Sequence, residues 1–491
     1  MSDPALAPAS LAALRQRHGA RYRWLLLASV MVGTMASIMS STIVNVGVPG
    51  LSHDFGIGQE RAQWVSSGFM VAMTVSMLTT PWLLARYGYR RIYAATMLLL
   101  MTGGIAGGLA SQFTLVLAAR VAEGLAAGVV QPIPAIIILR AFEPHEQGRA
   151  SGFFGMGVVL APALGPSIGG VLVDWFGWRS VFFIVVPFCL ASLWMAFRYV
   201  PDSAPGGATA ERGQALDWRG LLLGSAGTLC LLNGLVELHG NRLHAALLLG
   251  AAAAALLGFI GWQRRQAARG AEPLMNLALF RHRSFAMGSV VAFIYGTALF
   301  GSTYLFPIYM QLGLGLAASH VGTILLPSGV VLALVIALVG RLADRHPTWL
   351  LVSTGLALLA VSFALMVTVG LGTALWVLVA WAILGRTGLG FILPSLNLGA
   401  MRGLDKALIP QGASAINFLR TLGGAAGVSL CGIALEWRIA AHGATLDQGL
   451  PSAARLAAFD EVFLMLAALC VLALLAALRL RPPAAPREGP E

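Results

Sequence analysis

The feature that most constrains this chain is a series of about fourteen apolar runs, each long enough to cross a lipid bilayer. A membrane-crossing helix needs about 20 such residues. Helices are the expected structure, since lipid cannot satisfy free backbone N–H and C=O groups. The sequence therefore predicts an all-α integral membrane protein. The runs lie at residues 24–48, 63–84, 92–110, 113–139, 150–173, 180–199, 219–237, 245–263, 285–310, 319–340, 348–369, 374–398, 411–435 and 460–480.

The composition excludes a water-soluble protein. Hydrophobic residues make up 58% of the 491 residues and charged residues only 11%, and the mean hydropathy is +0.80. Soluble domains carry about 25% charged residues. The net charge of +12 would suggest nucleic-acid binding in a soluble chain. Here the arginines lie in short loops, so they indicate membrane orientation and no nucleic-acid partner is expected.

The placement of the arginines predicts how the bundle is oriented. If the N-terminus is cytoplasmic, every second loop is cytoplasmic, and these loops hold most of the Arg and Lys residues. This is the positive-inside pattern, and it predicts a multi-pass protein with both termini cytoplasmic. The outside loops hold only Arg61, Arg179, Arg242, Arg438 and Arg455.

The runs divide the chain into two halves of six helices. A short sequence repeat supports this division, because Gly128-Val-Val-Gln-Pro132 resembles Gly390-Phe-Ile-Leu-Pro394 at the matching place in the other half. Coincidence among glycine-rich helices is the alternative. Residues 437–459 are expected to form the longest outside loop. The expected segments are a cytoplasmic N-terminal segment (1–23), the first half (24–199), a cytoplasmic linker (200–218), two inserted helices (219–263), a cytoplasmic loop (264–284), the second half (285–480) and a disordered tail (481–491).

Several short motifs occur in the order, and on the runs, that one family uses. On these motifs the chain resembles the fourteen-helix drug:proton antiporter family of the major facilitator superfamily (EmrB/QacA type), from about Trp24 to Leu480. The motifs include Ser41-Thr-Ile-Val-Asn-Val-Gly-Val-Pro49, Arg120-Val-Ala-Glu-Gly124, Gly155-Met-Gly157, Gly165-Pro-Ser-Ile-Gly-Gly170 and Gly340-Arg-Leu-Ala-Asp-Arg345. The resemblance implies the major facilitator fold with two inserted helices. It also implies multidrug efflux of amphipathic organic compounds by proton antiport and alternating access in the bacterial inner (cytoplasmic) membrane.

The resemblance also assigns an antiporter motif and a cytoplasmic gate. The motif glycines let a neighbouring backbone approach closely, and Pro166 is expected to bend the helix. For Asp344 and Arg345, a solvated pair of loop residues is the alternative. The motif residues are Gly155, Gly157, Gly165, Pro166, Gly169 and Gly170, and the gate residues are Arg86, Gly340, Asp344 and Arg345.

Four ionisable residues lie well inside the predicted runs: Arg120, Glu123, Arg386 and Arg420. Such a group costs about 2.5–3.5 kcal/mol at the bilayer centre, so it is rarely placed there without a use. Arg120 and Glu123 are one helical turn apart and can pair. The family's aspartate in the first helix corresponds to Ser40, so the carboxylate has moved to Glu123. We therefore expect Glu123 and Arg120 to couple protons, and a permanent structural ion pair is the alternative. Structural roles are the alternative for Arg386 and Arg420.

Polar residues at helical spacing predict a water-accessible substrate cavity between the halves. Thr34, Ser37, Ser41 and Asn45 form one stripe, and Gln131 returns to the face of Arg120. Lipid-facing packing is the alternative for the aromatic candidates. The expected lining residues are Ser37, Ser41, Asn45, Gln131, Tyr295, Phe300, Tyr304, Asn397 and Arg420.

Two rival functions stay open. The same fold could export a siderophore, a lipid or a metabolite, because the family's first-helix acid is missing. A polytopic membrane enzyme or sensor is the other rival, but the sequence shows no metal-ligand cluster or phosphate loop, so no catalysis, cofactor or metal is expected. The expected partners are a small-molecule substrate, protons and the lipid bilayer, with a periplasmic adaptor protein as a further candidate.

Overall fold

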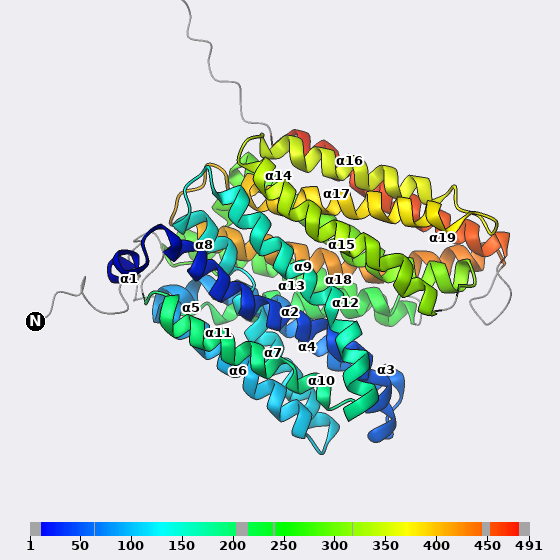
Figure 1. Ribbon diagram of the computed structural model, residues 1–491, viewed down its shortest axis with the longest axis horizontal. Coiled ribbons are helices and arrows are strands. Elements are labelled where there is room, and N and C mark those ends of the chain that lie inside the picture. Colours follow the sequence, from blue (N-terminus) through cyan, green and yellow to red (C-terminus); the bar gives the residue numbers. More distant parts are fainter. Residues whose placement is uncertain are drawn as a thin grey trace, which may run out of the picture.

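The computed structural model describes residues 11–62, 64–202, 215–238, 241–316, 318–443 and 452–480, and all regular elements in these ranges are helices. Figure 1 shows long helices that lie side by side with their axes roughly aligned. Thirteen helices of the described residues are long and apolar enough to cross a membrane. The predicted run 150–173 falls in α9 (Gln147–Phe176), a 30-residue helix in which four side chains, those of residues 163, 164, 166 and 167, lie outside the description.

The first half is organised around α2 and α7. Helix α2 packs against α9 and α11, and α7 packs against α4 and α6. A short helix, α1 (Leu11–His18), and one 3-10 turn, η2 (Gly19–Arg21), precede this half. Its helices are α2 (Tyr22–Asp54), α3 (Gln59–Ala62), α4 (Trp64–Ser76), α5 (Thr80–Tyr87), α6 (Tyr89–Leu109), α7 (Phe113–Val130), α8 (Ile133–Ala141), α9, α10 (Ser180–Phe183) and α11 (Val185–Tyr199).

The second half is organised around two helix pairs. Helix α14 packs against α18, and α17 packs against both α15 and α16. Its helices are α14 (Arg283–Ile308), α15 (Ala318–Ala343), α16 (Thr348–Met366), α17 (Leu375–Met401), α18 (Ile409–Ala441) and α19 (Ala453–Leu478). The turn η4 (Leu277–Arg281) precedes α14, and the π-helical turn η5 (Tyr309–Gly313) follows it.

The two inserted helices form a pair of their own. Helix α12 (Trp218–Val236) packs along α13 (Arg242–Ala268), and α12 also contacts α18 and α4. Asp217 caps α12 and accepts hydrogen bonds from Trp262 and Gln263 of α13, each at 2.8 Å. The pair therefore joins the bundle through one helix from each half.

Three predicted runs are interrupted, and proline accounts for each break. Proline lacks an N–H, and its ring clashes with the carbonyl four residues earlier. Helix α7 accordingly ends at Val130, four residues before Pro134, and α10 ends at Phe183, four residues before Pro187. The 3-10 turn η3 (Met77–Thr79) likewise begins four residues before Pro81.

The predicted loops are shorter than expected where the structure describes them. The predicted bounds of the outside loop, 437–459, are wrong at both ends. Helix α18 continues to Ala441, and α19 begins at Ala453. Helix α2 likewise continues beyond residue 48 to Asp54. Polar residues ended each apolar run there, but backbone hydrogen bonding continues through them. Most of the predicted linker (203–214) and the predicted disordered tail (481–491) lie outside the described residues.

The two halves meet through α9 and α15 and through the first part of α18. Helix α18 contacts η3, α5 and α8 of the first half. Arg140 Nη2 of α8 donates to the carbonyl of Lys406 across 2.7 Å. In Figure 1, α1 and α8 lie toward the end of the molecule that carries the N-terminus. In the predicted orientation this is the cytoplasmic end.

Candidate functional site

Three buried polar side chains from α2 and α7 form one cluster. Arg120 and Glu123 are fully buried on α7, and Arg120 Nη1 lies 2.5 Å from Glu123 Oε2. The same Nη1 donates to Ser40 Oγ of α2 at 2.8 Å, and Ser40 donates to Glu123 Oε2 at 3.3 Å. The structure therefore brings the predicted pair together with Ser40, the residue that the motif resemblance matches to an aspartate.

Further contacts tie Arg120 to a third helix. Its Nε donates to the Val65 carbonyl of α4 at 3.1 Å, and its guanidinium carbon lies 4.2 Å from the Phe69 ring centre, a cation–π distance. Glu123 Oε1 is buried and has no hydrogen-bond partner among the described residues. A proton can bind this oxygen without displacing an existing hydrogen bond.

Along the predicted polar stripe of α2, Thr34 and Ser37 are buried, Ser41 is half-buried and Asn45 is exposed. Thr34 and Ser37 are fully buried and donate to carbonyls of their own helix, at Val30 (2.8 Å) and Thr34 (3.1 Å). Ser41 also donates within α2, to the Ile38 carbonyl at 2.6 Å. The hydroxyls of Thr34, Ser37 and Ser41 therefore have hydrogen-bond partners on the preceding turn of α2, and the cavity lining stays a prediction.

The remaining first-half candidates lie apart from the cluster. Asn45 is exposed, and its Oδ1 accepts from Ser66 Oγ of α4 at 2.5 Å. Gln131 is half-buried at the C-terminal cap of α7, where the helix breaks before Pro134.

The second-half candidates divide into two groups. Tyr295 is buried on α14 and interacts electrostatically with both Arg386 and Arg420. Phe300 and Tyr304 instead pack against α18, where a Cβ placed at Gly424 would lie 3.0 Å from Phe300 Cε2 and one at Gly432 would lie 3.5 Å from the Tyr304 hydroxyl. Asn397 lies half-buried on α17.

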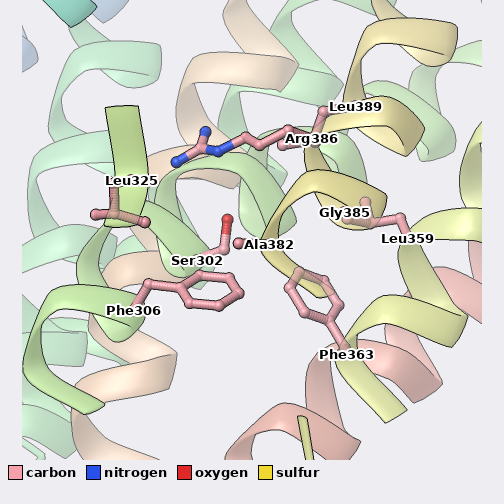
Figure 2. A pocket seen from close by; sticks show the side chains of 9 residues that line it. All are labelled: Ser302, Phe306, Leu325, Leu359, Phe363, Ala382, Gly385, Arg386 and Leu389. Carbon is pink, nitrogen blue, oxygen red and sulfur yellow. The ribbon is translucent and has the colours of Figure 1, made fainter. Parts of the chain in front are cut away.

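A pocket lies inside the second half, among α14, α15, α16 and α17 (Figure 2). Sequence reasoning placed the cavity between the halves and named none of the aromatic residues of this pocket. Its cavity volume is about 10 Å³, enough for about one water molecule. The lining residues are Ser302, Phe306, Leu325, Leu359, Phe363, Ala382, Gly385, Arg386 and Leu389.

Sequence reasoning also missed a carboxylate in the last helix. Asp460 lies seven residues inside α19, and its Oδ1 is buried without a hydrogen-bond partner among the described residues. The predicted run begins at residue 460, which places this acid at its boundary. An acid followed by a long apolar run is the signal that would have found it.

The antiporter motif of α9 packs on two sides. Toward α2, a Cβ placed at Gly165 would lie 2.7 Å from Thr42 Oγ1, and one at Gly169 would lie 2.6 Å from Ile43 Cγ1. A Cβ at Gly157 would likewise meet the flexible Met31 side chain of α2, whereas one at Gly155 would lie 2.8 Å from Ile336 Cγ2 of α15. A Cβ at Gly170 has no described heavy atom within 4 Å, and the Pro166 side chain lies outside the description.

Two of the predicted gate residues cross from α15 to α9. Asp344 accepts hydrogen bonds from the backbone N–H groups of Gly148 (2.6 Å) and Arg149 (2.9 Å), in the first turn of α9. Burial raises the pKa of Asp344 above its ordinary value, although both N–H donors act in the opposite direction. A Cβ placed at Gly340 would lie 2.7 Å from the Gly148 carbonyl oxygen, so only glycine permits this approach.

The other two predicted gate residues lie elsewhere. The Arg86 guanidinium lies over the rings of Trp82 (5.6 Å) and Tyr87 (5.8 Å), on its own helix α5. Arg345 is exposed beyond the end of α15. The described residues contain no group of three or more His, Cys, Asp or Glu side chains that could hold a metal ion.

Comparison with known proteins places this bundle in a family. Residues 30–428 match the Major Facilitator Superfamily model. Multidrug resistance protein Stp of Mycobacterium tuberculosis is 27% identical over 436 residues, which cover 88% of this chain and 79% of that protein. The riboflavin transporter RibZ of Clostridioides difficile is 22% identical over 409 residues, which cover 83% of this chain and 87% of that protein.

A solved structure shows the same fold. The human organic anion transporter MFSD10 (TETRAN) superposes with a TM-score of 0.66 at 16% identity, covering 93% of this chain and 99% of that one. The predicted fold class is thereby confirmed. The chain belongs to the Major Facilitator Superfamily, a family of membrane transporters.

Proposed function

We propose that this protein is a secondary active exporter of small amphipathic organic molecules, of the fourteen-helix drug:proton antiporter type, in the bacterial inner membrane. The observation that carries the proposal is the buried cluster of Ser40, Arg120 and Glu123, which links α2 to α7. The similarity to multidrug resistance protein Stp supports an efflux role. The similarity to a riboflavin transporter favours a metabolite as the cargo in the second candidate function.

Protonation of Glu123 supplies the coupling step. In the unprotonated state the carboxylate and the Arg120 guanidinium neutralise each other inside the bundle. A proton on Glu123 leaves Arg120 as a buried cation without a counter-charge, and breaking a buried pair in this way costs about 3–5 kcal/mol. That free energy favours a rearrangement of α2, α4 and α7 that admits water to Arg120.

The gate residues supply the second part of alternating access. Asp344 and Gly340 hold the start of α9 against the end of α15, which closes the predicted cytoplasmic end. Separation of the two helices exposes the first-turn N–H groups of α9 to water. Movement along the α9 seam then opens one end of the bundle as the other closes. A periplasmic adaptor protein stays a prediction from sequence.

Transport by the purified protein in sealed liposomes tests this function. With an imposed pH gradient, we expect solute movement accompanied by proton flux in the opposite direction, both lost in Glu123→Gln. Solute movement that no pH gradient accelerates would refute proton antiport. A solute that is chemically changed, but not moved across the membrane, would favour the enzyme alternative.

A further inference from the structure

We infer that the second half holds a binding site for an anionic group, formed by Arg386, Arg420 and Tyr295, and that the cargo is an organic anion. Its acidic group is a carboxylate, a sulfonate or a phosphate, and it is joined to an apolar body. The inference about cargo rests on the proposed export function, whereas the binding site stands on its own geometry.

Both arginines lie deep within membrane-spanning helices. Arg386 lies fifteen residues before the end of α17 at Met401, and Arg420 lies eleven residues after the start of α18 at Ile409. At about 1.5 Å per residue these positions are roughly 23 Å and 17 Å from the same side of the bundle. Arg386 is also roughly 17 Å from the opposite end of α17, so its guanidinium is too deep to reach either aqueous interface.

The two arginines lack the counter-charge that Arg120 has. Arg420 Nη2 donates to Asn417 Oδ1 at 2.6 Å, which is a neutral partner. Among the described residues, Arg386 makes no hydrogen bond, and no carboxylate forms an ion pair with Arg386 or Arg420. Tyr295 of α14 lies beside Arg420, since a Cβ placed at the adjacent Gly296 would lie 2.9 Å from the carbonyl carbon of Arg420, and its hydroxyl is within Coulombic range of both guanidinium groups. Two positive charges inside the membrane-spanning region thus lack a counter-charge, although a charge there is costly.

The backbone that carries this site is held firmly. Thr297 of α14 donates to the Gly423 carbonyl of α18 at 2.9 Å. A Cβ placed at Gly296 would lie 2.9 Å from Gly424 N, so α14 and α18 approach closely beside Tyr295 and Arg420. The Tyr295 hydroxyl and the Arg420 guanidinium therefore project from a closely packed pair of helices. A planar guanidinium can bind two oxygens of a carboxylate or phosphate at once.

An apolar surface adjoins Arg386. In Figure 2 its side chain extends from α17 toward Leu325 of α15, beside the pocket that also contains Phe306 and Phe363. An acidic group on the guanidinium would place an attached apolar body against these rings. The pocket is nearly closed, at about 10 Å³, so a ligand must move α15 away from α17. Helix α15 also carries Gly340, so ligand binding and gate opening act on one helix.

A matched pair of dyes tests the site. Fluorescein and rhodamine 123 share a xanthene core, but the first is an anion and the second a cation near neutral pH. Binding of each dye to the full chain in lipid nanodiscs is measured by fluorescence anisotropy. We expect saturable fluorescein binding that weakens at least ten-fold in Arg386→Gln and in Arg420→Gln, with no weakening for rhodamine 123. Arg402→Gln, an exposed arginine just beyond α17, is the control and should bind like the parent.

A charge-retaining variant, Arg386→Lys, tests the site even if a glutamine variant fails to fold. Arg386→Lys retains the charge and should keep more fluorescein binding than Arg386→Gln. Fluorescein binding that is absent from the parent, or unchanged in both glutamine variants, overturns the anion site. The same dyes in the liposome transport assay separate the two proposals. Fluorescein that binds but is not transported leaves the site standing and refutes export, whereas transport of rhodamine 123 alone refutes the anionic cargo and leaves export standing.

Discussion

Ser40 of α2 and Glu123 of α7 share a hydrogen bond of 3.3 Å between Ser40 Oγ and Glu123 Oε2. By the motif resemblance, Ser40 corresponds to the aspartate of the fourteen-helix antiporter family. That position therefore lies within one hydrogen bond of a carboxylate on α7, the helix that also carries Arg120. The cluster holds one carboxylate and one guanidinium.

The first prediction concerns the acid itself. Glu123→Gln keeps the shape of the side chain but cannot release a proton, so export driven by a pH gradient should fall at least ten-fold while substrate binding persists. Gradient-driven uptake into inverted vesicles measures the first quantity and equilibrium binding the second. Glu143→Gln, an exposed acid beyond α8, is the control. Unchanged gradient-driven export in Glu123→Gln would refute the coupling role.

The second prediction moves the acid back to α2. In Glu123→Gln with Ser40→Asp, the new carboxylate starts from a position 2.8 Å from Arg120 Nη1. We expect the double variant to recover a substantial part of the gradient-driven export that Glu123→Gln loses. The same vesicle assay compares the single and double variants at equal expression. No recovery in a double variant that folds and inserts would show that the carboxylate must lie on α7.

The third prediction concerns the seam between α9 and α2. Gly165→Leu should abolish transport but not membrane insertion, since even a Cβ there would lie 2.7 Å from Thr42 Oγ1. Overpacking of this kind typically costs about 1–3 kcal/mol. Gly170→Leu, in the same motif but with no described atom within 4 Å, should be tolerated. Equal transport by the two variants would contradict the seam.

The fourth prediction concerns the gate. Asp344→Ala removes the acceptor of two N–H groups of α9, and each such hydrogen bond contributes about 0.5–1.5 kcal/mol. The cytoplasmic end should therefore open more often, with a longer distance between spin labels at residues 143 and 402. Asp405→Ala, an exposed acid in the loop after α17, should leave the label distance unchanged. The same distance distribution in both variants would rule out a gating role for Asp344.

The fifth prediction concerns orientation. Ala441 and Ala267 are both exposed near the C-terminal ends of long helices, α18 and α13. In intact cells an impermeant thiol reagent should label Ala441→Cys and not Ala267→Cys. Three of the four native cysteines are buried and one is half-buried, so background labelling should be low. Labelling of both positions from outside would refute the predicted topology.

The fold was largely predictable, because a membrane-crossing helix requires a long apolar run, and such a run can be recognised directly in the amino-acid sequence. The helix ends were less predictable, because hydropathy does not report backbone hydrogen bonding. Helix α2 continues past Pro49 to Asp54, whereas α7 stops before Pro134. The two prolines look alike in sequence, and their surroundings decide the outcome.

The candidate site was predictable only where its members are close along the chain. The spacing of Arg120 and Glu123 predicts their pairing, since residues one turn apart share a helix face. The pocket beside Arg386 draws Phe306 and Phe363 from two other helices, and no local pattern relates them. The polarity of the α2 stripe does not by itself imply contact with water, because serine and threonine hydroxyls in helices can bond to carbonyls of the preceding turn.

The burial of Arg120 and Glu123 within the bundle has an electrical consequence. The unprotonated pair carries no net charge, but a proton on Glu123 gives it one positive charge inside the membrane. One charge moved across the whole membrane changes in free energy by about 2.3 kcal/mol per 100 mV, and a group part-way across experiences a fraction of this. The protonated state thus responds to the membrane voltage as well as to the pH difference. A cell that holds its voltage while its pH gradient collapses would still bias the transport cycle.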